Sequence, residues 1–352
     1  MYEQEVRAIA EEYLENVKPS GSENIMASCP FHATDNPRGY SMTFSMSLTK
    51  GVYHCFSCGE SGNLRTFLRK LGVRGKKLLK YNYVIEKVRE NHPLAEKGKQ
   101  KKKVAIPLIE ERVLGVFDYL PEELLEAGFW PETLNHFDVG YDQHWGRITY
   151  PVRDLTGGLV AIVGRRKDSD NKYLPYGKEL EQWGIFGVKP PPLGQLLWHA
   201  DVVAPEALIS KRWEPVVLVE GYKGCMWVWQ CGYHRVVHSY GADLTDEQAK
   251  IITKLGQEVI IMFDGDRAGD WGAIKAGYKL RKSMRVRVAE LMNGHQPDHL
   301  NIEEVEEVLD CSEMFEKWKR TKETDEWRRA KRLKKLMDQS KPWRRSDNED
   351  DT

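Results

Sequence analysis

Two pairs of metal-ligating side chains constrain what the N-terminal part of this chain can fold into. The first pair lies in Cys29-Pro30-Phe31-His32 and the second in Cys55-Phe56-Ser57-Cys58. A separation of two residues lets both side chains of a pair turn onto one ion, and a Cys₃His set favours tetrahedral Zn²⁺. Because four protein ligands leave no open position, we predict one structural zinc ion that stabilises a small module.

Apolar patterns around these pairs predict the rest of a zinc-ribbon module over residues 1–75. Residues 3–17 carry apolar side chains at helical spacing, and Asn63 is placed to cap a second amphipathic helix. Alternation in 41–46 predicts one strand and residues 52–54 predict the next, with a turn between them.

Composition excludes several classes of protein. The chain has 352 residues, enough for two or three domains, and its 53 Lys+Arg balance its 53 Asp+Glu. No apolar run is long enough to span a bilayer, and the first thirty residues lack a signal-peptide core, so we expect a cytoplasmic protein, in the host cytoplasm if it is viral. In a reducing compartment we expect Cys225, Cys231 and Cys311 to be buried or incidental thiols. His54 is an alternative zinc ligand, although its side chain would point away from that of Cys55 on a strand.

Acidic side chains end two apolar strands in the second half of the chain. Residues 216–219 lead to Glu220, and residues 259–263 lead to Asp264-Gly265-Asp266. Continuously apolar strands are typical of a parallel sheet covered on both faces, so these acids should meet at its carboxyl edge, where ligands bind. Their hard oxygen ligands favour Mg²⁺ or Mn²⁺ and a phosphoryl-transfer site; the alternative is that they only cap helices.

Basic residues mark three further stretches. Residues 76–107 are rich in lysine and predict a flexible linker that serves either as a plain tether or as a phosphate contact. Residues 147–154 and 159–166 predict a hairpin. The basic residues on or beside it are Arg147, Arg165, Arg166, Lys167 and Lys172. They suit a nucleic-acid backbone or a nucleoside triphosphate, although a solvated hairpin can have the same composition. The C-terminal segment 311–352 is charged and predicts a helix with a disordered tail.

Three blocks of this sequence resemble the bacterial and phage DNA primases that join a CHC2-like zinc-binding domain to a Toprim-containing RNA polymerase domain. Residues 29–32 with 53–63 resemble the zinc block, and 147–174 resemble the basic-ridge block. Residues 219–222, 264–269 and 297–298 resemble the Toprim block. The likeness covers roughly residues 25–310.

The resemblance implies a multidomain fold with a structural Zn²⁺ and one or two catalytic Mg²⁺ or Mn²⁺ ions. The implied order is a zinc-ribbon β domain at 1–75, a basic linker at 76–107, an α+β N-terminal subdomain of the polymerase at 108–210, an α/β Toprim domain at 211–310 and a charged helical tail at 311–352.

The resemblance also implies roles for individual residues. Magnesium would be held by Glu220, Asp264, Asp266 and Asp298, of which the first three would act in catalysis together with Lys172. Nucleic acid or nucleotide would contact Arg147, Arg165, Arg166 and Lys172. Two positions depart from the family, since Gly224 and Gln296 stand where acids are usual, which leaves fewer ligands for a second ion.

We therefore expect a primase that makes short RNA primers on single-stranded DNA from ribonucleoside triphosphates by metal-dependent nucleotidyl transfer. The zinc ribbon would read unstacked template bases through Tyr40 or Tyr53. The sequence has no Walker loop, so a replicative helicase would be a partner on a separate chain. Two alternatives remain open: a Toprim-type metal-dependent nuclease, and a non-catalytic single-stranded-DNA-binding replication adaptor.

Overall fold

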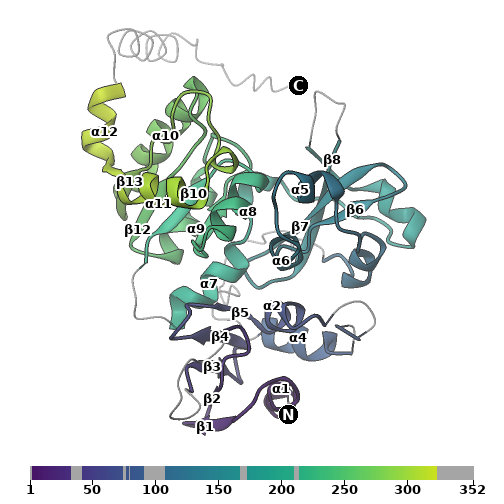
Figure 1. The fold of residues 1–352 in the computed structure, drawn as a ribbon. Coiled ribbons are helices and arrows are strands. Elements are labelled where there is room, and N and C mark those ends of the chain that lie inside the picture. Colours follow the sequence, from purple (N-terminus) through teal and green to yellow (C-terminus); the bar gives the residue numbers. More distant parts are fainter. Residues whose placement is uncertain are drawn as a thin grey trace, which may run out of the picture.

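Three β-sheets follow one another along the chain in the computed structural model (Figure 1). The structure describes residues 2–32, 42–73, 77–78, 80–90, 108–166, 173–209 and 214–322. For 89–90 and 205–209 it describes the backbone alone. Tyr40, Lys167 and Lys172 lie outside the described residues. Within those residues, no helix has the length and apolarity needed to cross a bilayer.

The first sheet is an antiparallel meander in which each strand pairs with the next along the chain. Both predicted strands form, and the predicted first helix ends at Tyr13, four residues before Val17. Asn63 caps the second helix, since its side chain accepts a hydrogen bond from the Thr66 amide at 3.0 Å. The elements are α1 (Tyr2–Tyr13), β1 (Lys18–Ser20), β2 (Asn24–Ala27), β3 (Phe44–Ser47), β4 (Val52–Cys55), β5 (Ser61–Asn63) and α2 (Leu64–Lys70).

Aromatic packing fills the core of this first sheet. The ring of Tyr53 is fully buried, stacks on Phe44 at a centroid distance of 5.2 Å and also packs on Phe67. Its hydroxyl donates to the carboxylate of Glu60 at 3.2 Å. The prediction that Tyr53 reads template bases is therefore wrong, because a side chain that is part of the core offers no face for a base to stack on.

The stretch predicted to be a flexible linker contains a packed helix. Helix α4 (Asn82–Glu90) lies against α1, and Leu78, Val84 and Val88 are buried in the same core as the zinc sheet. Val84 and Val88 are four residues apart and so share one face of the helix. The expectation of a linker over 76–107 is thus wrong for this part, and residues 91–107 lie outside the described residues.

The second sheet is antiparallel and carries the predicted basic hairpin. Strands β7 (Arg147–Arg153) and β8 (Leu159–Arg165) pair as expected, between β6 (Gly140–Asp142) and β9 (Tyr173–Pro175). Both central strands are almost wholly buried. The helices around this sheet are η1 (Glu111–Val116), α5 (Glu122–Glu126), α6 (Pro131–His136), η2 (Lys178–Trp183), η3 (Leu193–Gln195) and α7 (Ala200–Ile209).

The third sheet is the predicted α/β sheet. Strand β10 (Val216–Val219) lies parallel to both β11 (Val236–His238) and β12 (Glu258–Ile261), and β13 (Arg285–Val288) continues the parallel order. Separate apolar cores lie on its two faces, which explains the continuously apolar strands. The helices are α8 (Tyr222–Gln230), α9 (Asp246–Leu255), α10 (Arg267–Leu280), η4 (Pro297–His299), α11 (Ile302–Asp310) and α12 (Phe315–Lys322).

Packing of the third sheet extends beyond residue 310. The strand expected to be last, β13, pairs with the antiparallel edge strand β14 (Glu313–Met314). Helix α12 follows, with Phe315 and Trp318 buried in the core on one face of the sheet. The segment predicted to be a charged tail therefore begins as a packed strand and helix, while 323–352 lie outside the described residues.

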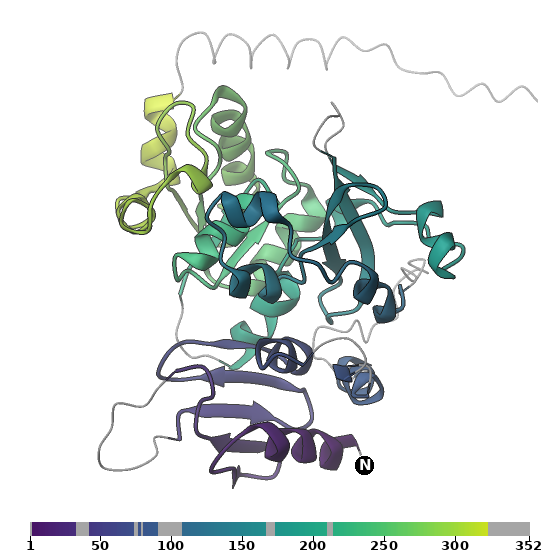
Figure 2. The ribbon, with the colours of Figure 1, turned by 45° about the vertical axis from the view of Figure 1, so that its right-hand side comes forward.

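The zinc module sits against the two other sheets, with α2 beside α6 and with β4 and β5 beside α7 (Figures 1 and 2). A buried cluster of charges crosses this boundary. Arg65 of α2 donates to Asp138 and to Glu111, at 2.5 Å each, and Arg153 of β7 donates to the same two acids at 2.8 and 2.6 Å. Arg69 also pairs with Asp138. Charges from both sides thus hold the module in place.

Candidate functional site

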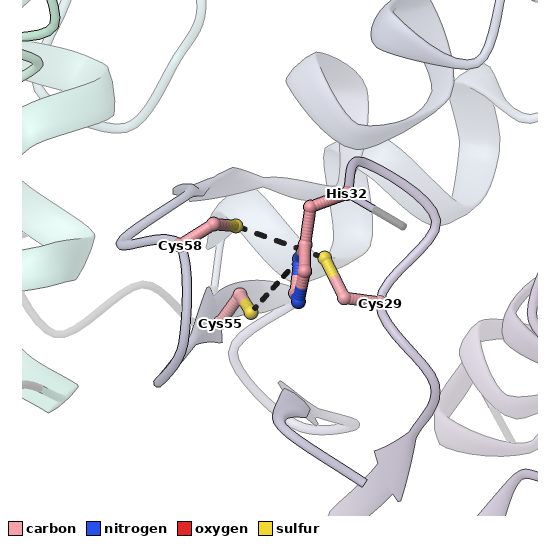
Figure 3. A group of neighbouring side chains, drawn as sticks. All are labelled: Cys29, His32, Cys55 and Cys58. Carbon is pink, nitrogen blue, oxygen red and sulfur yellow. Dashed lines mark hydrogen bonds between the residues drawn. The ribbon is translucent and has the colours of Figure 1, made fainter. Parts of the chain in front are cut away.

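The four predicted zinc ligands converge. Their ligand atoms all lie within 4.8 Å of one another, and Figure 3 shows the side chains of the two pairs pointing toward each other. The sulfurs of Cys29 and Cys58 are 3.9 Å apart, and Cys55 Sγ is 3.8 Å from His32 Nδ1. Tetrahedral zinc with sulfur bonds of about 2.3 Å places its ligands about 3.8 Å apart. The set therefore fits a closed zinc site.

The local backbone explains how the second pair is held. Cys55 ends β4, and its carbonyl accepts a hydrogen bond from the amide of Gly59, which has a left-handed φ of +76°. His54 points elsewhere, since it is buried and its ring packs edge-on against Phe56 at 4.9 Å. The alternative in which His54 serves as a ligand is therefore not supported. Phe56 itself is 58% exposed.

The predicted acids lie where the strands of the third sheet end. Glu220 follows β10, and its Oε1 accepts the backbone amide of Asp264 at 3.0 Å. Asp266 caps α10 by accepting the amide of Gly269 at 2.7 Å. At Gly269 a Cβ would lie 2.0 Å from the Asp264 carbonyl oxygen and 2.9 Å from Glu220 Oε1, so this close approach requires glycine.

Burial and neighbouring negative charge change how Glu220 and Asp264 titrate. Burial raises the pKa of Glu220 to about 7, with further increases from Asp264 and Asp266. Burial likewise raises the pKa of Asp264 to about 6, with contributions from Asp266 and Asp298. Both shifts oppose ionisation, and a divalent cation among the carboxylates would relieve this repulsion. The acid edge, which we define as Glu220, Asp264, Asp266 and Asp298, therefore suits a cation.

The acid edge is nevertheless an open arrangement. Among the described residues, the only set of three or more His, Cys, Asp or Glu ligand atoms within 4.8 Å of one another is the Cys₃His set. Gln296 donates to Asp264 Oδ2 at 3.1 Å. A Cβ at Gly224 would lie 3.1 Å from Pro297 Cγ, so a larger side chain there requires the proline to give way. Both departures noted in the sequence thus affect the geometry of this edge.

The predicted basic residues differ in accessibility. Arg147 is buried beneath Trp145 and Tyr176, with its guanidinium carbon 5.3 and 5.4 Å from their ring centroids. Arg165 is half-buried at the end of β8, and Arg166 is exposed. Lys172 lies outside the described residues. The structure thus brings Arg165 and Arg166 to the surface and places Arg147 under it.

Two family models match the chain: the Toprim domain over residues 214–291 and the CHC2 zinc finger over residues 2–103. The DNA primase of Halalkalibacterium halodurans is 29% identical over 330 residues, covering 78% of this chain and 52% of the relative. That of Clostridium acetobutylicum is 25% identical, covering 78% and 51%. The chain thus matches a CHC2 zinc finger and a Toprim domain, and it is similar over most of its length to these bacterial DNA primases. It spans about half the length of the curated relatives that it matches.

A solved structure extends the likeness to the fold. The zinc-binding and RNA polymerase domains of the Aquifex aeolicus primase superpose with a TM-score of 0.53 at 22% identity, covering 89% of this chain and 84% of that one. The N-terminal zinc-binding sheet, the middle antiparallel sheet and the Toprim sheet described above thus agree with the expected multidomain fold.

Two further side chains near Arg165 were not predicted from the sequence. Glu123 of α5 accepts a hydrogen bond from Arg165 Nη1 at 2.6 Å. Tyr150 of β7 is fully buried, and its hydroxyl has no hydrogen-bond partner among the described residues. Asp298 helps raise the pKa of Tyr150, after burial and Tyr173, so the acid edge lies within electrostatic reach of the middle sheet. Neither residue belongs to a motif, because their proximity arises only when two sheets meet.

Proposed function

We propose that this chain is a DNA primase that synthesises short RNA primers on single-stranded DNA. The observation that supports the proposal is that Arg165 at the end of β8 and Asp298 of the acid edge both act electrostatically on Tyr173 of β9. A carboxylate suited to a divalent cation and an arginine suited to phosphate thus act on the same side chain. In the reaction, the primer 3′-hydroxyl bonds to the α-phosphorus of a ribonucleoside triphosphate and pyrophosphate leaves.

Glu220, Asp264, Asp266 and Asp298 would hold one or two Mg²⁺ or Mn²⁺ ions in this proposal. When bound, the ion neutralises phosphate charge and favours ionisation of the attacking hydroxyl. Arg165, Arg166 and Lys172 would pair with the phosphates of the template and the nucleotide. Arg147, being buried, would support the strand end from below. These residue roles are part of the proposal, as are an N-terminal polymerase subdomain over 108–210 and a Toprim domain that begins at 211.

The zinc module would contribute to template selection. Phe56 is the exposed aromatic side chain beside the zinc ligands, and stacking of an unpaired base on such a ring is worth about 1–3 kcal/mol. The same role for Tyr40 stays a prediction. A replicative helicase on a separate chain stays part of the proposal, and co-purification of this chain with the helicase of its own replication system tests it.

A primer-synthesis assay across templates that contain every trinucleotide tests the function. The protein is incubated with single-stranded DNA, labelled ribonucleoside triphosphates and either Mg²⁺ or Mn²⁺. We expect short labelled RNA from the wild type, none from Asp264→Asn, and wild-type yield from Glu247→Gln, which removes an exposed acid on α9. Zinc content and melting temperature, measured on the same samples, show that the variants are folded.

The assay also separates the two other functions. Shortened DNA without labelled RNA supports the nuclease. Binding of single-stranded DNA without either reaction supports the adaptor, for which the amide of Gln296 on Asp264 and the glycine at 224 are the favouring observations. Either result would overturn the primase proposal.

A further inference from the structure

We propose that Glu123 competes internally for the phosphate-binding position at Arg165 and so weakens nucleotide and template binding in the resting protein. The inference rests on the proposed function, because it concerns the anion that Arg165 would bind. It assigns to Glu123 a role in setting affinity.

The geometry places the two charges in direct contact. Arg165 ends β8, where it is paired in the sheet with Ile148 on one side and Tyr173 on the other. Its Nη1 donates to Glu123 Oε1 at 2.6 Å, and the side chains of Arg165 and Glu123 are 18% and 35% exposed. A guanidinium held this way offers a phosphate less charge and fewer free N–H groups. An incoming phosphate must therefore displace Glu123.

A second observation indicates that a polar ligand belongs at this place. The Tyr150 hydroxyl is fully buried without a hydrogen-bond partner among the described residues, a state that normally costs free energy. The charged groups that act on it are Arg165, Glu123 and Asp298, together with the phenol of Tyr173. The unpartnered hydroxyl thus lies within electrostatic reach of the same ion pair.

The charge balance explains why Glu123 matters. The acid edge carries four carboxylates, and Glu123 adds a fifth negative charge that acts on Tyr150 together with Asp298. When a triphosphate approaches Arg165, the charge of the guanidinium is already balanced by Glu123. Removing the charge of Glu123 leaves the guanidinium its full positive charge, while Arg165 remains fixed at the end of a buried strand.

The test is equilibrium binding of ATP with Mg²⁺, and of a single-stranded DNA oligonucleotide over a range of KCl concentrations. We expect Glu123→Gln to bind ATP about fivefold more tightly, as expected for release of one partly exposed ion pair. For single-stranded DNA, one additional phosphate contact should steepen the slope of log affinity against log salt by about 0.7. Glu123→Asp, which keeps the charge, should restore a slope close to that of the wild type.

Controls separate competition from a structural effect. Glu126→Gln removes an exposed acid from the same helix and should change neither quantity. Arg165→Ala should abolish the gain when combined with Glu123→Gln. If Glu123→Gln binds ATP as the wild type does, or more weakly, Glu123 only orients Arg165 and the inference is wrong. ATP binding is measured without turnover, so the two proposals can fail separately. If primers are made but Glu123→Gln does not tighten ATP binding, only this inference is wrong. If Glu123→Gln tightens ATP binding but no primers are made, only the proposed function is wrong.

Discussion

The zinc centre and the acid edge are two metal sites of opposite design within one chain. At the zinc centre the four ligand atoms already lie within 4.8 Å of one another, and two of the three cysteines are buried. At the acid edge Glu220 and Asp264 follow different strands, and burial together with neighbouring carboxylates raises the pKa of each. The first site is complete without any other molecule, whereas the second requires water and phosphate oxygens to complete the coordination of an ion.

This difference shows what each metal does for the protein. A closed site binds its ion as the module folds, so zinc affinity contributes to folding free energy. An open site keeps its carboxylates apart at a cost in repulsion, which the cation and the substrate together relieve. Stability should therefore depend mainly on zinc, and binding of nucleotide mainly on the second metal. Loss of zinc should therefore have a larger effect on the protein than any change at the acid edge.

Cys55→Ser should eliminate zinc binding and unfold the module of residues 2–73. The loss is expected to reach about 10 kcal/mol or more, the range of structural zinc affinities, because the sulfur is fully buried among the other ligands. Zinc content by atomic absorption and circular dichroism measure it. As a control, the variant Cys311→Ser, which replaces an exposed cysteine, should keep its zinc. Stoichiometric zinc in Cys55→Ser would show that the site is not closed.

The boundary between the zinc module and the remaining domains provides a second test. Asp138 carries a buried side chain that binds Arg65, Arg69 and Arg153, and its left-handed φ of +57° also suits asparagine. Asp138→Asn should therefore preserve the backbone but destabilise docking by about 3 kcal/mol, because it leaves arginine charge buried and unpaired. Limited proteolysis and denaturant unfolding measure this, and the exposed Glu132→Gln on α6 is the matched control.

The pH dependence of this boundary has a definite sign. Burial by itself would raise the pKa of Asp138, but Arg65, Arg69 and Arg153 hold it well below its usual range. Its contribution to stability is therefore present above the ordinary aspartate pKa, and it is lost as pH falls through the lowered one. Docking that is unchanged by acid in the wild type would contradict this assignment.

Sequence patterns were sufficient wherever local spacing determines structure. The two ligand pairs, the cap at Asn63 and the parallel strands ending in Glu220 and Asp264 all follow from residues a few positions apart. Contacts between distant segments were not predictable in the same way. The burial of Tyr53 reverses an expectation of exposure, because a tyrosine on a strand can face either the core or the solvent.

The basic residues show the same limitation more clearly. Arg147 and Arg165 look alike in the sequence, yet one is buried under aromatic rings and the other ends a strand beside Glu123. The charge cluster at Arg65 and Asp138 joins residues 73 positions apart and has no sequence signature. The sequence did not predict helix α4, because its lysine-rich surroundings favoured a linker over a helix with two buried valines.

A third test compares the two metal sites by pH. Since the pKa of Glu220 is raised to about 7 and that of Asp264 to about 6, both protonate as pH falls from 7.5 to 6. Protons then compete with the cation, and Mn²⁺ affinity at the acid edge should drop about tenfold. Electron paramagnetic resonance of Mn²⁺ measures this. Zinc content should stay constant over the same range, and a parallel loss of both metals would remove the contrast.

The smallest expected effect concerns the amide that caps Asp264. Gln296 Nε2 donates to Asp264 Oδ2 and thereby occupies an oxygen that could bind a cation. Gln296→Asp should free that oxygen and add a carboxylate, so Mn²⁺ affinity should rise about threefold, since one exposed charge interaction is worth up to about 1 kcal/mol. The gain should increase with pH, because the added charge raises the pKa of Asp264 further and must itself be ionised.

Gln296→Ala separates the two causes of that gain. It frees Asp264 Oδ2 without adding charge, so an equal rise in Mn²⁺ affinity in both variants would assign the effect to the freed oxygen. A rise in Gln296→Asp alone would assign it to the added carboxylate, and the acid edge would then be limited by its number of ligands. If neither variant changes Mn²⁺ affinity, the ion does not approach Asp264 Oδ2. The open design would then arise from the spacing of the strand ends alone, with no part played by the replacement at position 296.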